Sequence, residues 1–313
     1  MKMKKKTAGI SPLRRNTGPM IVLFLTPALL LFVAVFAYPV IRTFLMSFMK
    51  VEGVTDPVST WSFNGLQNYI KAFADPMMKA AMWNLTRLWL VGGIAVMFLA
   101  LVYAVILTSG IRAKSFFRSV IYLPNLVSAV AMGTMWLFYA LRYEDYGLLN
   151  TIVRFFGGEN VAWTGPDLKF WSMLMAYCFG MVGYHMLIFM SGIERIGDDY
   201  YEAATIEGAN IFQQFFHITL PLLRGPIRTN IVMWTVSSVG FFIWGQVFDP
   251  VNLSYQTVFP LNYMYELVFG SSNAALAKRD SGIGAAIGVI MALLVVIMFG
   301  LSNFIVKNDD VEI

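Results

Sequence analysis

Three acidic residues, Asp198, Asp199 and Glu202, have the most chemically suggestive spacing in the chain. Carboxylates at this spacing can hold Mg²⁺ against a diphosphate group, which is the chemistry of a prenyltransferase. Such chemistry needs a second acidic cluster facing the first, so that the metal ions bridge the diphosphate. The other Asp-Asp pair, Asp309 and Asp310, is at the carboxyl-terminal end. A membrane-embedded prenyltransferase is therefore the less favoured interpretation of this motif.

The same residues also fit two short helices joined by a turn. Asp199 and Glu202 have the spacing of a capping box, with Asp in the place of Ser or Thr. Gly208 can adopt the positive φ that a turn between helices needs. Pro221 is expected to end the second helix, because the residue before a proline avoids the helical region. The polar stretch 194–221 is thus predicted to form a helical hairpin.

Small and acidic residues gather near the predicted turn. Ala203, Ala204 and Ala209 would let the backbone of another protein approach closely. Glu202 and Glu207 would offer charge to a basic partner. On physical grounds alone a structural role stays open, in which Glu202 caps a helix and the phenylalanines pack against membrane helices.

The amino-acid composition indicates the class of protein to which this hairpin belongs. Of the 313 residues, 58% are apolar and 13% are charged, whereas soluble domains are about 25% charged. The mean hydropathy of +0.65 excludes a cytosolic enzyme and a disordered chain, and a net charge of +5 is too small for a nucleic-acid surface. The single cysteine, Cys178, excludes a disulfide framework. The chain is therefore predicted to be a polytopic membrane protein.

Crossing a bilayer takes about 20 apolar helical residues. Six stretches meet this requirement: 20–49, 88–108, 119–141, 170–192, 227–248 and 282–306. The first follows a basic amino terminus, but it is too long for a signal peptide and lacks a clear cleavage site. We therefore expect an uncleaved first span.

The distribution of Lys and Arg predicts the orientation. More of these residues lie in the segments on the side of the amino terminus than on the other side, so both termini are expected in the cytoplasm. The chain then divides into a basic cytoplasmic tail (1–19), a transmembrane domain (20–306) and a second cytoplasmic tail (307–313). The polar loop (193–226) is expected to face the cytoplasm.

Polar and aromatic side chains inside the spans are candidates for a substrate pathway, since apolar spans do not need them. They recur on one face of the fifth span at i, i+3, i+4 and i+7, and two tyrosines share a face of the fourth span. The candidates are Tyr177, Tyr184, Trp234, Ser237, Ser238 and Phe241. Aromatic rings beside hydroxyl groups suit a neutral saccharide, although ordinary helix packing uses the same residue types.

Two histidines are weaker candidates. His185, in the fourth span, could serve a proton relay, but a hydrogen bond to a neighbouring helix explains it more simply. His217 lies in the polar loop without a companion ligand. The sequence predicts no metal site.

The run Glu202-Ala-Ala-x-x-x-Gly208-Ala209, followed by Phe215-x-x-Ile218-x-Leu220-Pro221, resembles the EAA loop of binding-protein-dependent ABC importer permeases. The six-span layout is similar to the carbohydrate-uptake branch of this family, particularly to the maltose (MalF) and glycerol-3-phosphate permeases. Two outer segments share this likeness: Phe63-Asn-Gly-Leu-x-Asn-Tyr69 and Gly147-Leu-Leu-Asn150.

The chain departs from the family pattern at three places. Gly197 stands where proline is usual, Glu207 stands where Asp is usual, and Gly225 occupies the position where proline is expected before Pro226. These departures affect the expected ends of the local helices.

The resemblance implies an all-α polytopic membrane protein with six transmembrane helices and the type I ABC importer permease fold. It makes the polar loop a coupling helix seated in a cleft of a cytoplasmic ATPase. The residues that it implicates in coupling are Glu202, Ala203, Ala204, Glu207, Gly208, Ala209, Leu220 and Pro221. In maltose-type permeases the spans that match the fourth and fifth here line the sugar site.

The resemblance also implies an assembly in a bacterial inner membrane. It contains a second permease subunit, expected to form a heterodimer with this chain, two cytoplasmic ATPase subunits and an extracytoplasmic solute-binding protein. The chain has no G-x-x-x-x-G-K-[ST] loop, so ATP and Mg²⁺ are expected to belong to the ATPase subunits. The chain itself is expected to be a transport subunit that is no enzyme and binds neither cofactor nor nucleic acid.

The expected function is the permease of an ATP-driven importer for a neutral oligo- or disaccharide. The main alternative is an ion-coupled secondary transporter, which would ordinarily carry carboxylates within the membrane. The six predicted spans contain no Asp or Glu, which favours the ATP-driven importer. Monosaccharides, oligosaccharides and glycerol phosphate all remain compatible with the sequence.

Overall fold

The computed structural model of the chain describes residues 17–144, 146–250, 254–270 and 279–305. These residues are mainly helical, with a small antiparallel pair of strands, β1 (Met49–Lys50) and β2 (Ser62–Phe63). The predicted all-α class is confirmed for this part of the chain. The predicted tails lie outside the described residues, except for residues 17–19.

Sixteen α-helices are described over these ranges. They are α1 (Thr17–Phe32), α2 (Tyr38–Met46), α3 (Gln67–Ala74), α4 (Pro76–Arg87), α5 (Gly93–Thr108), α6 (Lys114–Leu126), α7 (Ala129–Met135), α8 (Leu148–Phe155), α9 (Lys169–Ile193), α10 (Asp198–Ile206), α11 (Ile211–Gln214), α12 (Leu220–Leu222), α13 (Arg224–Val239), α14 (Ile243–Phe248), α15 (Pro260–Phe269) and α16 (Ser281–Ile305). The chain also forms π-helical turns at Val33–Ala37, Leu88–Gly92, Trp136–Ala140 and Phe215–Thr219, and a 3₁₀ turn at Val58–Thr60.

Four continuous helical stretches are long and apolar enough to cross a membrane: Gly18–Met46, Pro76–Thr108, Lys169–Ile193 and Ser281–Phe304. They coincide with the first, second, fourth and sixth predicted spans. The second begins well before the predicted residue 88, because Asp75 caps it. The Asp75 carboxylate accepts hydrogen bonds from the backbone N–H groups of Met77 (2.7 Å) and Met78 (3.4 Å).

The third predicted span is not a straight helix, which corrects the prediction. The stretches Lys114–Leu126 and Ala129–Ala140 meet at an angle of 96°. Val127 is extended at the break, and the Ser128 hydroxyl caps the next helix by accepting a hydrogen bond from Ala131 N–H at 3.2 Å. Pro124, inside the last turn of α6, also weakens the helix there. The bent pair counts as a fifth crossing only if both halves are taken together.

The fifth predicted span is also divided. α13 has 16 residues and ends at Val239, and the short α14 follows after Gly240. The described part of the chain thus contains four candidate spans, or five with the bent pair. The layout of six spans remains a prediction.

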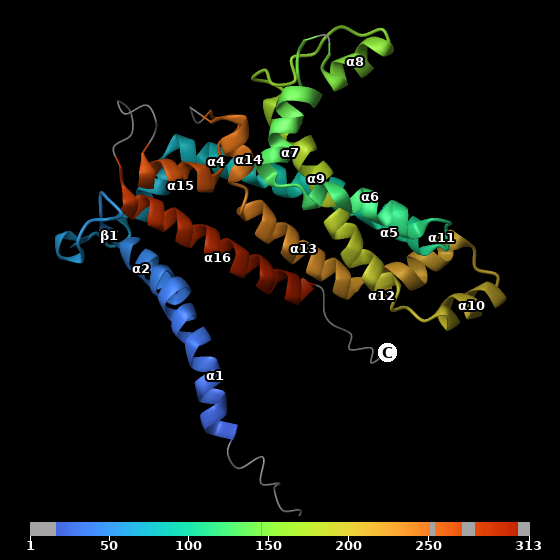
Figure 1. Cartoon of the computed structure of the whole chain (residues 1–313), viewed down its shortest axis with the longest axis horizontal. Coiled ribbons are helices and arrows are strands. Elements are labelled where there is room, and N and C mark those ends of the chain that lie inside the picture. Colours follow the sequence, from blue (N-terminus) through green and yellow to red (C-terminus); the bar gives the residue numbers. More distant parts are fainter. Residues whose placement is uncertain (1–16, 145, 251–253, 271–278, 306–313) are drawn as a thin grey trace, which may run out of the picture.

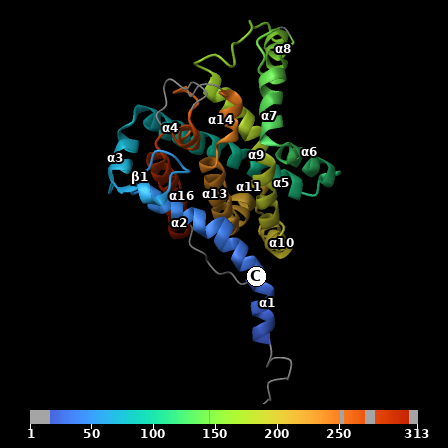
Figure 2. The ribbon, with the colours of Figure 1, turned by 60° about the vertical axis from the view of Figure 1, so that its left-hand side comes forward.

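Most of the helices that follow α2 form one packed body, and α1, α8 and α10 project from it (Figure 1). None of the residues in the most apolar stretch of Gly18–Met46 is buried. α9 is the central helix, since it packs against α5, α6 and α13, and α13 packs in turn against α16 (Figure 2). α9 ends just before the polar loop and α13 begins just after it. The packing of these two helices therefore positions both the polar loop and the candidate pathway residues, which lie on the fourth and fifth predicted spans.

Candidate functional site

The polar loop folds as the predicted hairpin, but its caps differ from the prediction. α10 begins after Gly197, so Asp198 and Asp199 lie in its first turn, where the helix dipole favours acidic residues. Because Gly197 is the N-cap, the Asp199–Glu202 capping box is wrong. A capping box occurs instead at the second helix, where Asn210 and Gln213 each accept a hydrogen bond from the other's backbone N–H, at 2.9 and 2.8 Å. The Asn-x-x-Gln spacing could have identified it from the sequence.

Gly208 makes the turn of the hairpin, as predicted. Its φ of +81° lies in the left-handed region that favours glycine. The turn is closed by hydrogen bonds from Gly208 N–H to Thr205 C=O (3.0 Å) and from Ala209 N–H to Ala204 C=O (2.9 Å). These hydrogen bonds join the end of α10 directly to the turn.

The turn of the hairpin is accessible. Glu202, Ala203 and Glu207 are exposed, and Ala204 and Ala209 are half-buried. A hollow of about 390 Å³ lies on the hairpin, lined mainly by short or polar side chains. Its lining residues are Ala204, Glu207, Gly208, Ala209, Gln213, Gln214, His217 and Ile218. A surface of this kind can receive a protruding segment of another protein.

Pro221 does not end the second helix, contrary to the prediction. The chain stays helical from Ile211 to Leu222, with a π-helical turn at Phe215–Thr219. Proline lacks the N–H group for a regular helical hydrogen bond, and a π-helical turn accommodates that loss. Pro221 is exposed, whereas Leu220 is half-buried.

Two polar contacts lie within the hairpin and at its base. The Tyr201 hydroxyl lies 2.9 Å from Oγ1 of Thr219, which joins α10 to the π-helical turn of the second helix. Lys114 Nζ donates to Glu194 Oε1 at 2.7 Å, which joins the start of α6 to the residue after α9. The hairpin is therefore braced internally, and the end of α9 from which it leaves is tied to α6.

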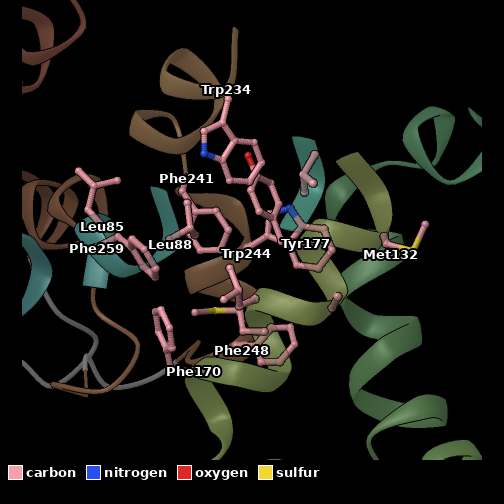
Figure 3. Packing of buried hydrophobic residues seen from close by; sticks show 14 of the residues in the cluster. Leu85, Leu88, Met132, Phe170, Tyr177, Trp234, Phe241, Trp244, Phe248 and Phe259 are labelled. Carbon is pink, nitrogen blue, oxygen red and sulfur yellow. The ribbon is translucent and has the colours of Figure 1, made fainter. Parts of the chain in front are cut away.

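Three of the candidate pathway residues meet in one aromatic cluster. The Tyr177 ring lies 5.5 Å from Trp234 and 4.8 Å from Phe241, centroid to centroid, and Figure 3 shows these rings pointing toward one another. All three side chains are buried. Ser238 is also buried, and its hydroxyl has no hydrogen-bond partner among the described residues. In this conformation the cluster is closed.

The other two candidates lie at its margin. Ser237 is half-buried on α13, and Tyr184 is half-buried on α9, two turns from Tyr177. The Tyr184 ring packs edge-on to His185 at 5.1 Å. Tyr184 therefore belongs to the same helix as the cluster without entering its centre.

Sequence reasoning missed several members of the cluster. Trp244 of α14 packs against Tyr177 at 5.7 Å, and Phe259 lies 4.3 Å from Phe241. These residues come from elements beyond the break in the fifth predicted span, so the periodicity of one helix could not place them. The Gly92–Gly93 pair was a usable signal, since it leaves room for the indole of Trp234.

His185 is fully buried and makes the interhelical hydrogen bond expected of it. Its Nδ1 lies 2.7 Å from Oδ1 of Asn230 on α13. His217 is exposed, and its Nδ1 lies 3.0 Å from the Gln213 carbonyl oxygen. Within the described residues, no group of three or more His, Cys, Asp or Glu side chains could hold a metal ion.

Comparison with known proteins identifies the family. The model of the family described as "Binding-protein-dependent transport system inner membrane component" matches residues 97–308, more than half of the chain. The arabinooligosaccharides transport system permease protein AraP of Bacillus subtilis (strain 168) is 29% identical over 278 residues, covering 88% of this chain and 85% of AraP. The alpha-glucoside transport system permease protein AglF of Rhizobium meliloti (strain 1021) is 32% identical over 286 residues, covering 88% of this chain and 78% of AglF.

Solved structures confirm the fold. A chain of a bacterial ABC transporter involved in the import of the acidic polysaccharide alginate superposes with a TM-score of 0.71 at 18% identity, covering 93% of this chain and 96% of that chain. A bacterial alginate ABC transporter in complex with an alginate pentasaccharide-bound periplasmic protein gives a TM-score of 0.69 at 19% identity, with 93% and 95% covered. The match of the family model over more than half of the sequence shows that the chain belongs to the family of binding-protein-dependent transport system inner membrane components.

Proposed function

We propose that this chain is the permease subunit of an ATP-driven importer of neutral oligo- or disaccharides. The observation that carries the proposal is the exposed hairpin of α10 and α11, in which acidic and small residues surround the turn at Gly208. In a chain of this family, such a hairpin fits the role of a coupling element between membrane helices and an ATPase.

The hairpin would seat in a cleft of a cytoplasmic ATPase subunit. Glu202 would pair with a basic residue there, and an exposed ion pair of this kind contributes about 0–1 kcal/mol. It would therefore set the position of the contact, while the surface around Ala203, Ala204 and Ala209 supplies most of the contact area. Closure of two ATPase subunits around ATP and Mg²⁺ would then move the hairpin and switch the pathway between outward and inward access.

The substrate assignment rests on the candidate pathway residues and on the named relatives. The six candidates are aromatic or hydroxyl-bearing and uncharged, which suits a neutral saccharide better than an acidic one. AraP and AglF are named for arabinooligosaccharides and alpha-glucosides. For the pathway to conduct, the cluster of Tyr177, Trp234 and Phe241 would have to become accessible through movement of α9 and α13 together relative to the rest of the transporter.

The proposal includes the remaining partners of such an importer. A second, different permease chain would complete the pathway, two ATPase subunits would bind the hairpins, and an extracytoplasmic binding protein would deliver the sugar. Six spans with both termini in the cytoplasm would place the hairpin on the ATPase side of a bacterial inner membrane. The alginate transporter solved with its periplasmic protein is a precedent for the last partner.

Reconstitution of the assembled transporter tests the proposal. With its binding protein and radiolabelled maltose, arabinotriose or maltotriose, proteoliposomes should take up at least one sugar, and vanadate should stop the uptake. Glu202→Lys should weaken co-purification of the ATPase subunits, because it replaces an attraction to the basic partner residue by a repulsion. Glu159→Lys is the control, since Glu159 is exposed and lies after α8, away from the hairpin (Figure 1).

Two results would overturn the proposal. Uptake that survives vanadate while an ion gradient persists would indicate an ion-coupled carrier. Full co-purification of the ATPase with Glu202→Lys, together with native uptake, would remove the hairpin as the coupling element.

A further inference from the structure

The two helices on either side of the coupling hairpin touch at their bases. A Cβ atom on Gly192, near the end of α9, would lie 2.4 Å from Cγ of Pro226 and 2.9 Å from Cδ2 of Leu223. Only a glycine allows the start of α13 to approach α9 this closely. Leu223 is fully buried in a cluster with Phe189 and Met190 of α9. The hairpin therefore leaves the membrane body from a tightly joined pair of helices.

A fully buried polar contact joins the same two helices further into the apolar body, in addition to the hydrogen bond between Tyr177 and Ser237. Nδ1 of His185 on α9 and Oδ1 of Asn230 on α13 are 2.7 Å apart, and both side chains are fully buried. The neighbouring Met186 is fully buried as well. In such surroundings a hydrogen bond is directional and joins two particular atoms, whereas packing between apolar side chains does not specify one pair of atoms.

Burial of this polar pair costs free energy of folding, which indicates a specific role for it. The second polar atoms of the pair, Nε2 of His185 and Nδ2 of Asn230, are buried and have no hydrogen-bond partner among the described residues. Two apolar side chains of similar size would fill the space without this penalty. Polar pairs are retained in apolar interfaces chiefly where they fix the register of two helices.

The His185–Asn230 pair lies between the candidate pathway residues and the coupling hairpin. His185 packs edge-on to Tyr184 (5.1 Å) and to Trp234 (5.8 Å), two of the candidate pathway residues. In the other direction, α9 ends at Ile193 and α13 begins at Arg224, where the hairpin is attached. The hydrogen bond thus lies between the candidate sugar-contacting rings and the coupling hairpin.

We propose that the His185–Asn230 hydrogen bond fixes the register of α9 and α13, so that the two helices carry the coupling hairpin and the pathway rings as one rigid unit. The proposal rests on the proposed function, since it concerns the transmission of ATPase movement to the pathway. His185 and Asn230 act as positioning residues. Without the bond, ATPase movement would be lost as sliding between α9 and α13.

The test uses the complete transporter in proteoliposomes. His185→Leu and Asn230→Leu remove the bond, His185→Gln keeps a side chain that can bond Asn230, and Met186→Leu is a buried control on the same helix. ATP hydrolysis and uptake are measured together, with the maltose, arabinotriose or maltotriose that the native protein transports. A second measurement needs no sugar: the distance distribution between nitroxides at Ile206 and Ile243, which are exposed on α10 and α14, in a Cys178→Ser background that retains ATPase activity.

The two leucine variants should each lower the sugar transported per ATP about fivefold and broaden the distance distribution, while ATP hydrolysis changes less than about twofold. The double variant should be no worse than either single variant, because both remove one bond. His185→Gln and Met186→Leu should keep the native ratio and the narrow distribution. Two outcomes would overturn the proposal. In the first, ATP hydrolysis and uptake fall together and the distance distribution does not broaden. In the second, both leucine variants keep the native amount of sugar transported per ATP.

The distance measurement separates this proposal from the proposed function. If the native transporter moves none of the sugars, the substrate assignment fails, and broadening in the leucine variants still supports the rigid unit. If neither leucine variant assembles while His185→Gln does, the pair is a general stability element and the register proposal fails.

Discussion

Gly93 lies directly against the indole of Trp234: a Cβ atom at position 93 would be 2.7 Å from Nε1 and 3.1 Å from Cδ1 of that ring. The same Nε1 donates a hydrogen bond to the Trp89 carbonyl oxygen at 2.8 Å. The glycine on one apolar helix and the tryptophan on another are therefore fitted to each other. This contact sets how deeply the aromatic cluster is buried between the helices.

Gly93→Ala is accordingly expected to destabilise the chain by about 1–3 kcal/mol, because the added methyl group must displace the indole or break its hydrogen bond. Gly180→Ala is the matched control, since a Cβ at Gly180 meets no other atom within 4 Å. Thermal unfolding of the purified transporter in detergent measures both. An equal shift of the melting temperature in the two variants would show that the contact between Gly93 and the Trp234 indole does not limit the side chain at position 93.

The capping of the hairpin gives a second prediction. Asn210→Ala removes a side chain that accepts from Gln213 N–H, which should destabilise the second helix by about 1 kcal/mol. Asp199→Ala removes a first-turn charge that makes no cap, so its effect should be smaller. Hydrogen exchange distinguishes them, since Asn210→Ala should speed exchange of the amides at 211–219 while Asp199→Ala leaves the amides at 200–206 of α10 nearly unchanged. A larger acceleration in α10 with Asp199→Ala than in the second helix with Asn210→Ala would support the capping box that the sequence suggested.

Tyr184 offers the cleanest test of the candidate pathway. Replacing Trp234 or Tyr177 by alanine would remove a buried core ring and cost about 3–5 kcal/mol, so a loss of uptake would not separate structure from transport. Tyr184 is half-buried and outside the cluster, and Tyr184→Ala should lower uptake with assembly and basal ATP hydrolysis intact. Tyr139→Ala, at an exposed position, is the control. Native uptake with Tyr184→Ala would remove this residue from the pathway.

The comparison of sequence and structure shows which features local patterns can predict. Continuous apolar runs such as 170–192 predicted their helix well, because a helix in a bilayer satisfies its own backbone groups. The bend at Val127–Ser128 was missed, because Pro124 is also compatible with a continuous membrane helix. The turn at Gly208 was predicted because positive φ is a property of one residue.

The candidate site divides in the same way. The periodicity of the fifth predicted span placed Trp234 and Ser238 correctly on one buried face of α13, whereas Phe241, although buried, lies beyond the end of that helix. It could not supply Trp244 and Phe259, which reach that face from other elements. Caps proved the least predictable feature, since the N-cap of α10 is Gly197 and not Asp199, and this difference of two residues removes the predicted capping box.

Two carboxylates outside the candidate spans should respond to pH with opposite sign. Burial raises the pKa of Glu266, on α15, so the folded state disfavours its charge. Glu266 therefore begins to destabilise the fold as the pH rises above its pKa in the unfolded chain, and the effect is complete above the raised folded pKa. The hydrogen bond from Arg142 instead lowers the pKa of Glu144. Its stabilising contribution is present above the unfolded pKa and is lost as the pH falls through the lowered folded value.

Glu266→Gln should therefore raise the melting temperature at pH 7, and this gain should disappear below about pH 4, where the carboxyl group is protonated in both the folded and the unfolded chain. Glu144→Gln should lower the melting temperature at pH 7, with a difference that also shrinks on acidification. Thermal unfolding at several pH values in one detergent measures both differences against the native transporter. A gain for Glu144→Gln or a loss for Glu266→Gln at pH 7 would contradict the assigned environments, because each would require the opposite direction of pKa shift.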